Sequence, residues 1–307
     1  MTSLDVVIVG AGPAGISAAI WAHTLKLRYA IVESAEAAGG QLLRVYNRVV
    51  DYAGMPSENG AALAERLRGH AGELGVAIRT GASVSSVDLE RGVLKVDDAE
   101  VESRFVVLAT GVRARSLGIP GEAAFVGRGV SPSASRYAEQ FRDRRVLVVG
   151  GGDAAFEEAL ILAGVCREVT LVHRSATFSA RADFRERVAS DPRIHVIEFA
   201  ELIEIEGADH VERVRLQVRG EGSALDVDGV FICAGVEPNS ELVADQVERD
   251  GRGYVAVDTQ MRSSHSLLYA VGDVRSGSSL TIAAAVGEGA TAIKDIQRRL
   301  TRGERKA

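Results

Sequence analysis

The feature that most constrains this chain is a short apolar run followed at once by glycines near its N-terminus. Val6 to Val9 are four consecutive β-formers, and Gly10-x-Gly12-x-x-Gly15 leads from them into a helical pattern that runs from Ile16 to about Thr24. In such a strand, turn and helix, the first glycine permits the tight turn, the second lets a pyrophosphate approach, and the third lets the helix pack on the strand. The unpaired N–H groups at the helix start carry partial positive charge. The stretch therefore predicts a site for a dinucleotide diphosphate.

An acidic residue ends the next predicted strand. Tyr29 to Val32 has the composition of a buried strand, and Glu33 follows it. In dinucleotide-binding folds, an acid about 20 residues beyond the glycines accepts hydrogen bonds from ribose hydroxyls. Glu33 thus gives the glycine motif the sequence context that it needs.

A second cycle of the same kind begins in the middle of the chain. Arg145 to Val149 predicts a strand, and Gly150-x-Gly152-x-x-Ala155 predicts the turn and helix start. The next predicted strand, Glu168 to Val172, ends in His173-Arg174 and not in an acid. A cation at that position suits a 2′-phosphate, which favours NADPH and leaves NADH open.

Two dinucleotide folds in one chain imply two dinucleotides, one tightly held and one that diffuses. Hydride transfer from a nicotinamide to a flavin is the natural use of that pair, so the sequence predicts FAD and NADPH. Gln41 and Asp51 lie in predicted loops beside the first nucleotide site, where polar groups can reach a flavin ring edge. Asp273 lies just past a buried run that starts at Leu268, where we expect it to hold a ribityl hydroxyl.

Composition excludes several other classes of function. The chain has 307 residues, enough for two domains, and its net charge of −6 argues against a nucleic-acid partner. It contains no apolar stretch of about 20 residues, and its first strand begins too early for a signal peptide, so we expect a cytoplasmic protein with no membrane partner. Cys166 and Cys233 follow no metal-ligand spacing and the six histidines are scattered, so we expect no metal.

Over nearly its whole length the chain resembles the low-molecular-weight thioredoxin reductases, a family of FAD- and NADPH-binding homodimers. The matching motifs are Gly10-x-Gly12-Pro13-Ala14-Gly15, Gly39-Gly40-Gln41-Leu42, Ala109-Thr110-Gly111, Gly118-Ile119-Pro120-Gly121-Glu122, Gly127-Arg128-Gly129-Val130-Ser131, Gly150-Gly151-Gly152-Asp153-Ala154-Ala155, Val172-His173-Arg174 and Gly272-Asp273-Val274. The resemblance implies an α/β fold with two Rossmann-like, three-layer ββα dinucleotide-binding domains. It implies a discontinuous FAD domain at residues 1–114 and 241–307, and an NAD(P)H domain at residues 115–240.

The expected cofactor-binding residues lie in these motifs and in the predicted strands and loops beside them. Those for FAD are Gly10, Gly12, Pro13, Ala14, Gly15, Glu33, Gly40, Gln41, Leu42, Asp51, Val84, Ala109, Thr110, Gly111, Gly272 and Asp273. Those for the nicotinamide dinucleotide are Gly150, Gly152, Asp153, Ala154, Ala155, His173, Arg174 and Arg181.

The decisive departure from the family follows Ser131. There the family has its redox-active Cys-x-x-Cys, with the inner sulfur against the flavin, and this chain has Ser133 and Arg136 at the two cysteine positions. A hydroxyl cannot exchange disulfides, and Cys166 and Cys233 belong to other elements. We therefore expect no thioredoxin reduction by the dithiol mechanism, and electron transfer to an external acceptor that is a small molecule or a redox protein. Ser133 and Arg136 are the candidates for residues that act near the flavin ring.

Two lesser departures concern the cofactors. Ser175 and Ser179 replace the second and third arginines of the family's phosphate-binding cluster, and Arg181 is a candidate for partial compensation. Each lost charge-assisted bond is worth roughly 1.5–3 kcal/mol, so the losses weaken the NADPH prediction. Leu280-Thr281 replaces the family's Arg-Gln contact to the flavin.

Several alternatives stay open. One is a flavin-dependent oxidase or dehydrogenase of a small organic substrate, with O2 or another carrier as acceptor and the second nucleotide fold as scaffold. Another is a ferredoxin–NADP reductase-like enzyme, although the chain lacks the extension beyond the last helix with which those enzymes cover the flavin. A low-molecular-weight disulfide reductase without an internal cysteine pair is a third. The last is a flavoprotein that has lost its redox chemistry and serves as a binding partner.

Overall fold

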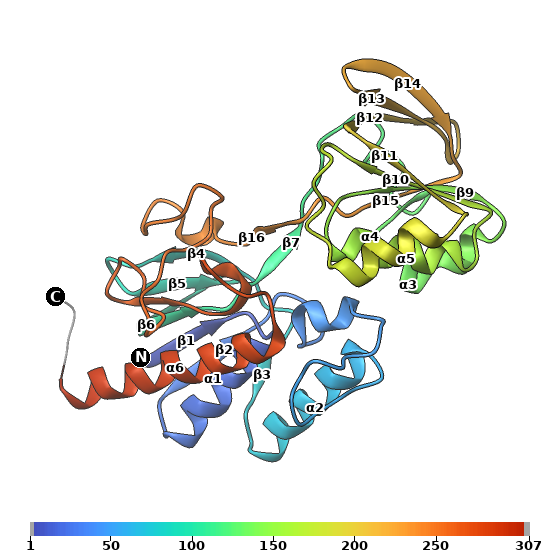
Figure 1. Cartoon of the computed structure of the whole chain (residues 1–307). Helices are drawn as coiled ribbons and strands as arrows, with labels where there is room; N and C mark the ends of the chain where they lie inside the picture. Colours follow the sequence, from blue (N-terminus) through green and yellow to red (C-terminus); the bar gives the residue numbers. More distant parts are fainter. Residues whose placement is uncertain (1–2, 304–307) are drawn as a thin grey trace. The chain divides into compact units, whose positions relative to one another are not determined.

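The computed structural model describes residues 3–303 and divides into two compact units (Figure 1). The first unit comprises the chain up to Arg113 and from Glu237 onward, and the second comprises Ala114–Val236. The sequence placed these boundaries after residues 114 and 240. Residues 237–240 group with the first unit because Asn239 exchanges hydrogen bonds with Thr110 and Ser240 Oγ donates to the Gly253 carbonyl.

The elements of the first unit come from both ends of the chain. They are β1 (Leu4–Val9), α1 (Pro13–Thr24), β2 (Tyr29–Val32), the 3₁₀ helix η1 (Gly40–Arg44), α2 (Gly60–Glu73), β3 (Ile78–Arg79), β4 (Val84–Asp88), β5 (Val93–Val96), β6 (Ala99–Leu108), the short helices η3 (Glu241–Val243) and η4 (Gly272–Val274), β17 (Leu268–Ala270) and α6 (Ile282–Thr301). Two further strands, β7 (Val112–Ala114) and β16 (Val236–Pro238), lie in the two connections between the units and pair with each other.

One sheet forms the centre of the first unit. Its parallel part has the order β3-β2-β1-β6, with β17 paired to the other side of β6. The first half of β6 instead pairs with β5 in the antiparallel meander β4-β5-β6. The carboxyl ends of β1 and β2 therefore lie beside each other, next to the ends of β6 and β17.

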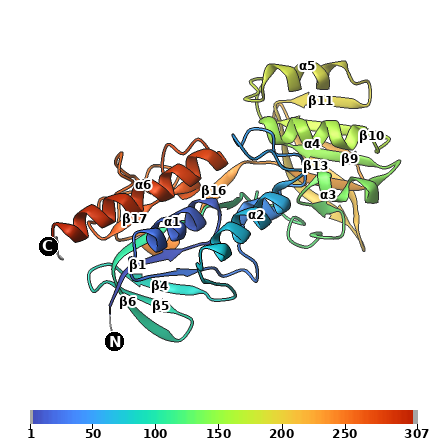
Figure 2. The same ribbon diagram turned by 90° about the horizontal axis from the view of Figure 1, so that it is seen from below.

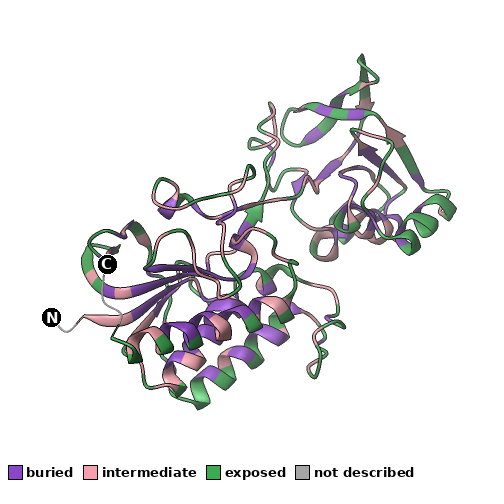
Figure 3. Ribbon diagram, turned by 60° about the vertical axis from the view of Figure 1, so that its left-hand side comes forward, coloured by how far each residue is buried: buried purple, intermediate pink, exposed green. Residues whose placement is uncertain are grey.

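Strict alternation along β1 creates the two hydrophobic cores of this unit. Val6 and Ile8 pack with the helices α1, α2 and α6, whereas Val7 and Val9 pack on the meander side. Figure 3 shows the strands as largely buried and the outer faces of the helices as exposed. The three layers of helix, parallel sheet and meander follow from this period of two.

The second unit repeats the architecture. Its elements are β8 (Val130–Ser131), α3 (Ala134–Tyr137), the 3₁₀ helix η2 (Ala138–Phe141), β9 (Arg145–Val149), α4 (Asp153–Ala163), β10 (Glu168–His173), α5 (Ala182–Ser190), β11 (Ile194–Glu198), β12 (Ala200–Gly207), β13 (Val211–Val218), β14 (Glu221–Asp226) and β15 (Gly229–Ile232). A parallel sheet of order β11-β10-β9-β15-β8 has α3, α4 and α5 on one face, and the antiparallel sheet β12-β13-β14 packs on the other (Figures 1 and 2).

None of the helices within residues 3–303 combines the length and the apolar composition needed to cross a bilayer.

Candidate cofactor-binding sites

In the glycine turn of the first unit, two glycines are needed for packing and the third leaves space for a ligand. Gly10 has φ of +102°, and a Cβ added there would lie 2.5 Å from the carbonyl oxygen of Ala109. A Cβ at Gly15 would overlap the carbonyl oxygen of Gly10. At Gly12 the nearest atom to an added Cβ is the Gly40 Cα at 3.9 Å. Packing therefore requires Gly10 and Gly15, whereas the space beside Gly12 is free for a ligand.

The start of α1 has the properties of a phosphate site. Gly12 is its N-cap, Pro13 occupies the first turn, no side chain caps the helix, and no acidic residue lies in the first turn. Proline lacks the N–H that would be unpaired there, and the following N–H groups lack a side-chain acceptor. A diphosphate fits this helix terminus because its oxygens accept hydrogen bonds from the free N–H groups and its negative charge matches their partial positive charge.

Glu33 lies at the end of β2, next to this turn. Its Oε2 accepts a hydrogen bond from the Ala11 N–H at 2.8 Å, and its Oε1 accepts one from the Ala35 N–H at 2.9 Å. These contacts fix the carboxylate, and each oxygen has a further lone pair for a ribose hydroxyl. Glu33 is therefore an oriented hydrogen-bond acceptor at the end of β2.

Gln41 and Asp273 meet although 232 positions separate them. The Gln41 Nε2 donates to Asp273 Oδ2 at 3.1 Å, and the Ser278 Oγ donates to Asp273 Oδ1 at 3.3 Å. Burial raises the pKa of the Asp273 carboxyl, although these two hydrogen bonds act to lower it. Gly111, at φ of +66°, is close by, since a Cβ there would lie 3.8 Å from Gln41 Nε2.

Glu288 and Asn239 support this region and were missed from the sequence. The buried Glu288 of α6 accepts the Gly272 N–H at 2.7 Å and pairs with Arg275, which fixes the turn that carries Asp273. The Asn239 Nδ2 donates to the Thr110 carbonyl at 2.9 Å and holds the end of β6. A charged residue between two glycines on an otherwise apolar helix face was a usable signal for Glu288, whereas nothing local marked Asn239.

Several other predicted FAD residues add no polar side chain to this cluster. Asp51 is exposed in a bend, and Val84 packs in the core on the meander side. Ala14 and Leu42 are buried in the helix-side core. The last two contribute backbone and packing, not a polar side chain.

The glycine turn of the second unit follows the same logic. Gly150 has φ of +152°, and a Cβ there would lie 2.5 Å from the Cys233 carbonyl oxygen and 2.8 Å from the Ala155 Cβ. Gly152 is the N-cap of α4, again without a side-chain cap. The His173 ring lies against Gly151, where an added Cβ would come within 2.6 Å of it. This ring closes one side of the turn.

Arg181 is already engaged in an ion pair. Its backbone N–H donates to Asp153 Oδ1 at 2.7 Å, and its Nε lies 3.1 Å from Asp153 Oδ2. The guanidinium also lies over the Phe184 ring at 4.5 Å. Arg174, by contrast, is exposed directly after β10, as a residue that receives a 2′-phosphate must be.

Ser133 and Arg136 lie on and beside the single-turn helix α3. Ser133 is its N-cap, with Oγ 3.4 Å from Glu158 Oε1 of α4, and the Ala134 N–H donates to the other oxygen of Glu158. The exposed Arg136 guanidinium lies over the Tyr137 ring at 5.2 Å. The segment is therefore anchored to α4 through its backbone and its first hydroxyl.

Both cysteines are free thiols in other elements. Cys166 follows α4, and burial raises its pKa to about 11. Cys233 follows β15, where burial and then the charge of Glu158 raise its pKa to about 12. Neither is a reactive thiolate near neutral pH.

Comparison with known proteins decides the family. The model of the pyridine nucleotide-disulphide oxidoreductases matches residues 4–289. The chain belongs to this family. It is 39% identical over 302 residues to a thioredoxin reductase of Mycolicibacterium smegmatis, with 96% of each chain covered, and 36% identical to one of Treponema pallidum, with 95% of each covered. The crystal structure of Lactococcus lactis thioredoxin reductase in its FR conformation superposes with a TM-score of 0.89 at 31% identity, covering 98% of this chain and 100% of that one.

Membership makes the chain an FAD-dependent pyridine nucleotide oxidoreductase of thioredoxin reductase-like fold, with FAD and NADPH as its cofactors. This confirms the predicted family resemblance, the pair of Rossmann-like domains and the two cofactors. The uncapped α1, the open side of Gly12 and the Gln41–Asp273 pair fit a dinucleotide in the first unit.

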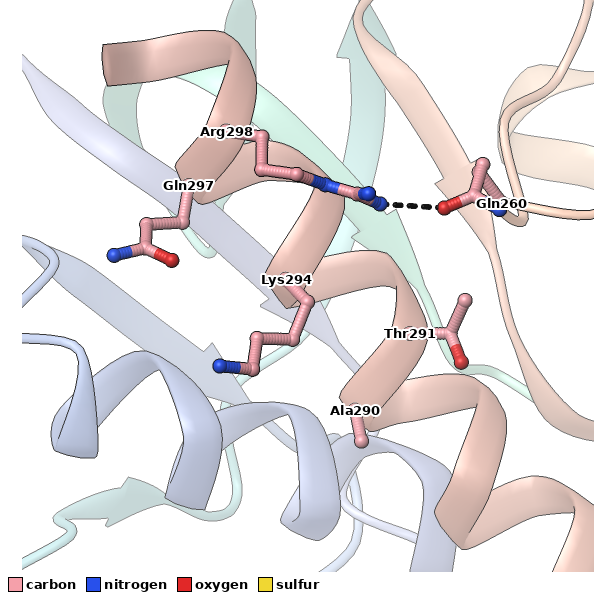
Figure 4. Close-up of a pocket in the computed structure, with 6 residues that line it drawn as sticks. All are labelled: Gln260, Ala290, Thr291, Lys294, Gln297 and Arg298. Carbon is pink, nitrogen blue, oxygen red and sulfur yellow. Dashed lines mark hydrogen bonds between the residues drawn. The ribbon is translucent and has the colours of Figure 1, made fainter.

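A hollow on the surface of the first unit has no part in either nucleotide site of this oxidoreductase. It has a volume of about 470 Å³ and lies on α6, lined by Gln260, Ala290, Thr291, Lys294, Gln297 and Arg298. Figure 4 shows the long side chains pointing to different sides of the helix, with Arg298 bonded to Gln260. No group of polar heads converges on it.

Proposed function

We propose that this chain is an NADPH oxidoreductase that delivers electrons through FAD to an external acceptor without using an enzyme disulfide. When bound, FAD supplies the two-electron chemistry that links NADPH to the acceptor. The chain's own residues bind and orient the two dinucleotides, which accounts for a site without a protein nucleophile.

The observation that carries the proposal is the identity of the anchored residues in α3. Ser133 and Arg136 stand where the resemblance places a cysteine pair, and neither side chain exchanges disulfides. The chain has two cysteines, and both are free thiols with raised pKa values in other elements. Thioredoxin reduction by the dithiol mechanism is accordingly outside the proposal.

The proposed cofactor assignment follows the two glycine turns. FAD lies in the first unit, with its diphosphate at α1 and its ribose and ribityl hydroxyls on Glu33 and Asp273. NADPH lies in the second unit, with its diphosphate at α4 and its 2′-phosphate on His173 and Arg174. We also propose a cytoplasmic homodimer, on the strength of the family resemblance.

The proposed acceptor is a small molecule or a redox protein. Relatives named thioredoxin reductases support a redox protein as one class. The exposed Arg136 replaces an uncharged thiol with a cation, which favours acceptors that carry negative charge.

The test is anaerobic mixing of the FAD-loaded protein with NADPH and, separately, with NADH, followed by the visible absorption of the flavin. Rapid bleaching by NADPH supports the proposal, and slower bleaching by NADH identifies the 2′-phosphate as a recognised group. Failure of both donors contradicts it.

One observation favours a second candidate, a flavin-dependent dehydrogenase of a small organic substrate. Arg181 is held by Asp153, and serines stand at the two family arginine positions, so the second unit offers a 2′-phosphate fewer cations than the family's cluster does. An organic donor that bleaches the flavin when both nicotinamide nucleotides fail would support this candidate.

A further inference from the structure

The strand order of the second unit predicts on which side of β9 each half of a bound dinucleotide lies. From β9 the chain continues to β10 and β11 on one side, whereas β15 and β8 lie on the other. Dinucleotides bind across the carboxyl ends of the strands at such a reversal. His173 and Arg174 end β10, so the adenosine half belongs on that side. The nicotinamide half must then extend over the ends of β15 and β8.

Polar groups lie within reach at the ends of β15 and β8. Neighbouring strands are about 4.8 Å apart, so the end of β8 lies about 10 Å from the glycine turn after β9, a span that half a dinucleotide covers. Cys233 directly follows β15, and its carbonyl oxygen lies against Gly150. Ser133 lies two residues beyond the end of β8. Glu158 of α4 contacts Ser133, which places a carboxylate at the same end.

Glu158 has acceptor capacity left over. Its Oε2 accepts the Ala134 N–H, whereas the contact of its Oε1 with the Ser133 Oγ is long, at 3.4 Å. Burial raises the pKa of this carboxyl, so the ionised form gains from any further N–H donor. The Ser133 hydroxyl is both a donor and an acceptor, and within the described part of the chain its hydrogen bonding is limited to this long contact.

A second observation comes from Ser131 at the end of β8. It is 8% exposed, and its Oγ has no hydrogen-bond partner among the described residues. Buried polar atoms are usually paired, and a lone hydroxyl at a strand end marks a place where a partner is missing. It lies two residues from Ser133 on the same segment.

We propose that Glu158 and Ser133 form the subsite for the nicotinamide carboxamide of NADPH. The proposal rests on the proposed function, in which the second unit binds NADPH. A primary carboxamide offers two N–H donors and one carbonyl acceptor. The carboxylate of Glu158 accepts from the amide nitrogen, and the Ser133 hydroxyl donates to the carbonyl. A nicotinic acid in the same place would set a second negative charge against Glu158.

The negative charge of the nicotinic acid analogue provides a test of the proposed subsite. Calorimetric titration of the FAD-loaded protein would compare three probes, namely NADP⁺, its nicotinic acid analogue, and adenosine 2′,5′-bisphosphate, which lacks the nicotinamide half. We expect NADP⁺ to bind about tenfold or more tightly than the nicotinic acid analogue. In Glu158→Gln the preference should fall to about threefold or less, because glutamine donates to a carboxylate, with affinity for the bisphosphate unchanged. Ser133→Ala should weaken the binding of NADP⁺ and leave the affinity for the bisphosphate unchanged.

Glu168→Gln is the matched control, since it removes the same charge at the first residue of β10, at the amino ends of the strands and away from the proposed subsite. It should change none of the three affinities. An unaltered NADP⁺ preference in Glu158→Gln would overturn the proposal, as would an equal loss of affinity for all three probes, which indicates a purely structural cap of α3. Absence of binding by both NADP⁺ and the bisphosphate would instead contradict the proposed function.

Discussion

Gly12 and Gly15 belong to one motif, yet the structure gives them different tasks. A methyl group at Gly15 overlaps the Gly10 carbonyl, whereas one at Gly12 meets nothing closer than 3.9 Å. We expect Gly15→Ala to destabilise the folded first unit by about 3 kcal/mol or more. Gly12→Ala should leave the melting temperature of the apoprotein nearly unchanged and lower its FAD affinity about tenfold.

Thermal unfolding of the two apoproteins and flavin titration distinguish these effects. Equal loss of stability in both variants would contradict the assignment of Gly12 to the ligand. So would undiminished FAD affinity in Gly12→Ala.

The cations of the second unit differ in how they are engaged. Arg174 is exposed after β10, whereas Arg181 is paired with Asp153. We expect Arg174→Ala to lower the preference for NADPH over NADH about tenfold or more, as the loss of a charge-assisted bond does. Arg181→Ala should change it by about threefold or less. Steady-state or rapid-mixing measurements with both nucleotides give the ratio, and a larger effect from Arg181 would show that this residue is the one that holds the 2′-phosphate.

At the scale of elements, α6 is held to the sheet by a buried carboxylate. Asp295 accepts hydrogen bonds from Arg262 at 2.6 and 2.7 Å and from the Tyr269 hydroxyl at 2.7 Å. Burial acts to raise the pKa of Asp295, but these bonds outweigh it and hold the pKa below the ordinary 3.8. Asp295→Asn should lower the unfolding free energy by about 3 kcal/mol at neutral pH, because the buried pair loses one charge.

The pH dependence of this effect has a definite sign. A carboxyl with a lowered folded pKa stabilises fully above its unfolded value and loses that contribution as the pH falls through the folded value. The stability difference between wild type and Asp295→Asn should therefore shrink below pH 3.8. Calorimetry at a series of pH values tests this, with Asp226→Asn at an exposed ion pair as a control that should cost less. A difference that grows on acidification would contradict the account.

Local pattern carried most of the element prediction. The continuous apolar run from Val6 to Val9 and the two glycine turns predict the strands and helix starts, because backbone sterics and burial act over a few residues. The helix bounds are less well predicted, since α1 begins at Pro13, about one turn before the Ile16 that the helical pattern predicts.

Local sequence patterns do not predict long-range polar contacts. Gln41 and Asp273 were both candidates, but their hydrogen bond joins residues from opposite ends of the chain. Glu158 was not a candidate at all, because its meaning depends on α3 packing beside α4. Such contacts depend on tertiary packing and not on local periodicity.

The absence of a cysteine pair at residues 133 and 136 sets how many electrons the whole molecule stores. An enzyme with FAD and a redox-active disulfide stores four electrons, whereas one with FAD alone stores two. Residues 133 and 136 are three positions apart, at the N-cap and in the single turn of α3, so the double variant Ser133→Cys and Arg136→Cys restores the Cys-x-x-Cys spacing. If the position corresponds to that of the family's cysteines, the double variant should raise the capacity toward four, and unchanged capacity would contradict that correspondence.

Storage of two electrons on FAD alone is tested by anaerobic reductive titration of the wild-type protein, with NADPH in one series and dithionite in the other. The flavin absorption and the number of free thiols are measured after each addition. We expect the flavin absorption to be fully bleached after two electrons per FAD, with no new thiols. Uptake of four electrons with two thiols released would contradict it, because it would demand a disulfide that Ser133 and Arg136 cannot form.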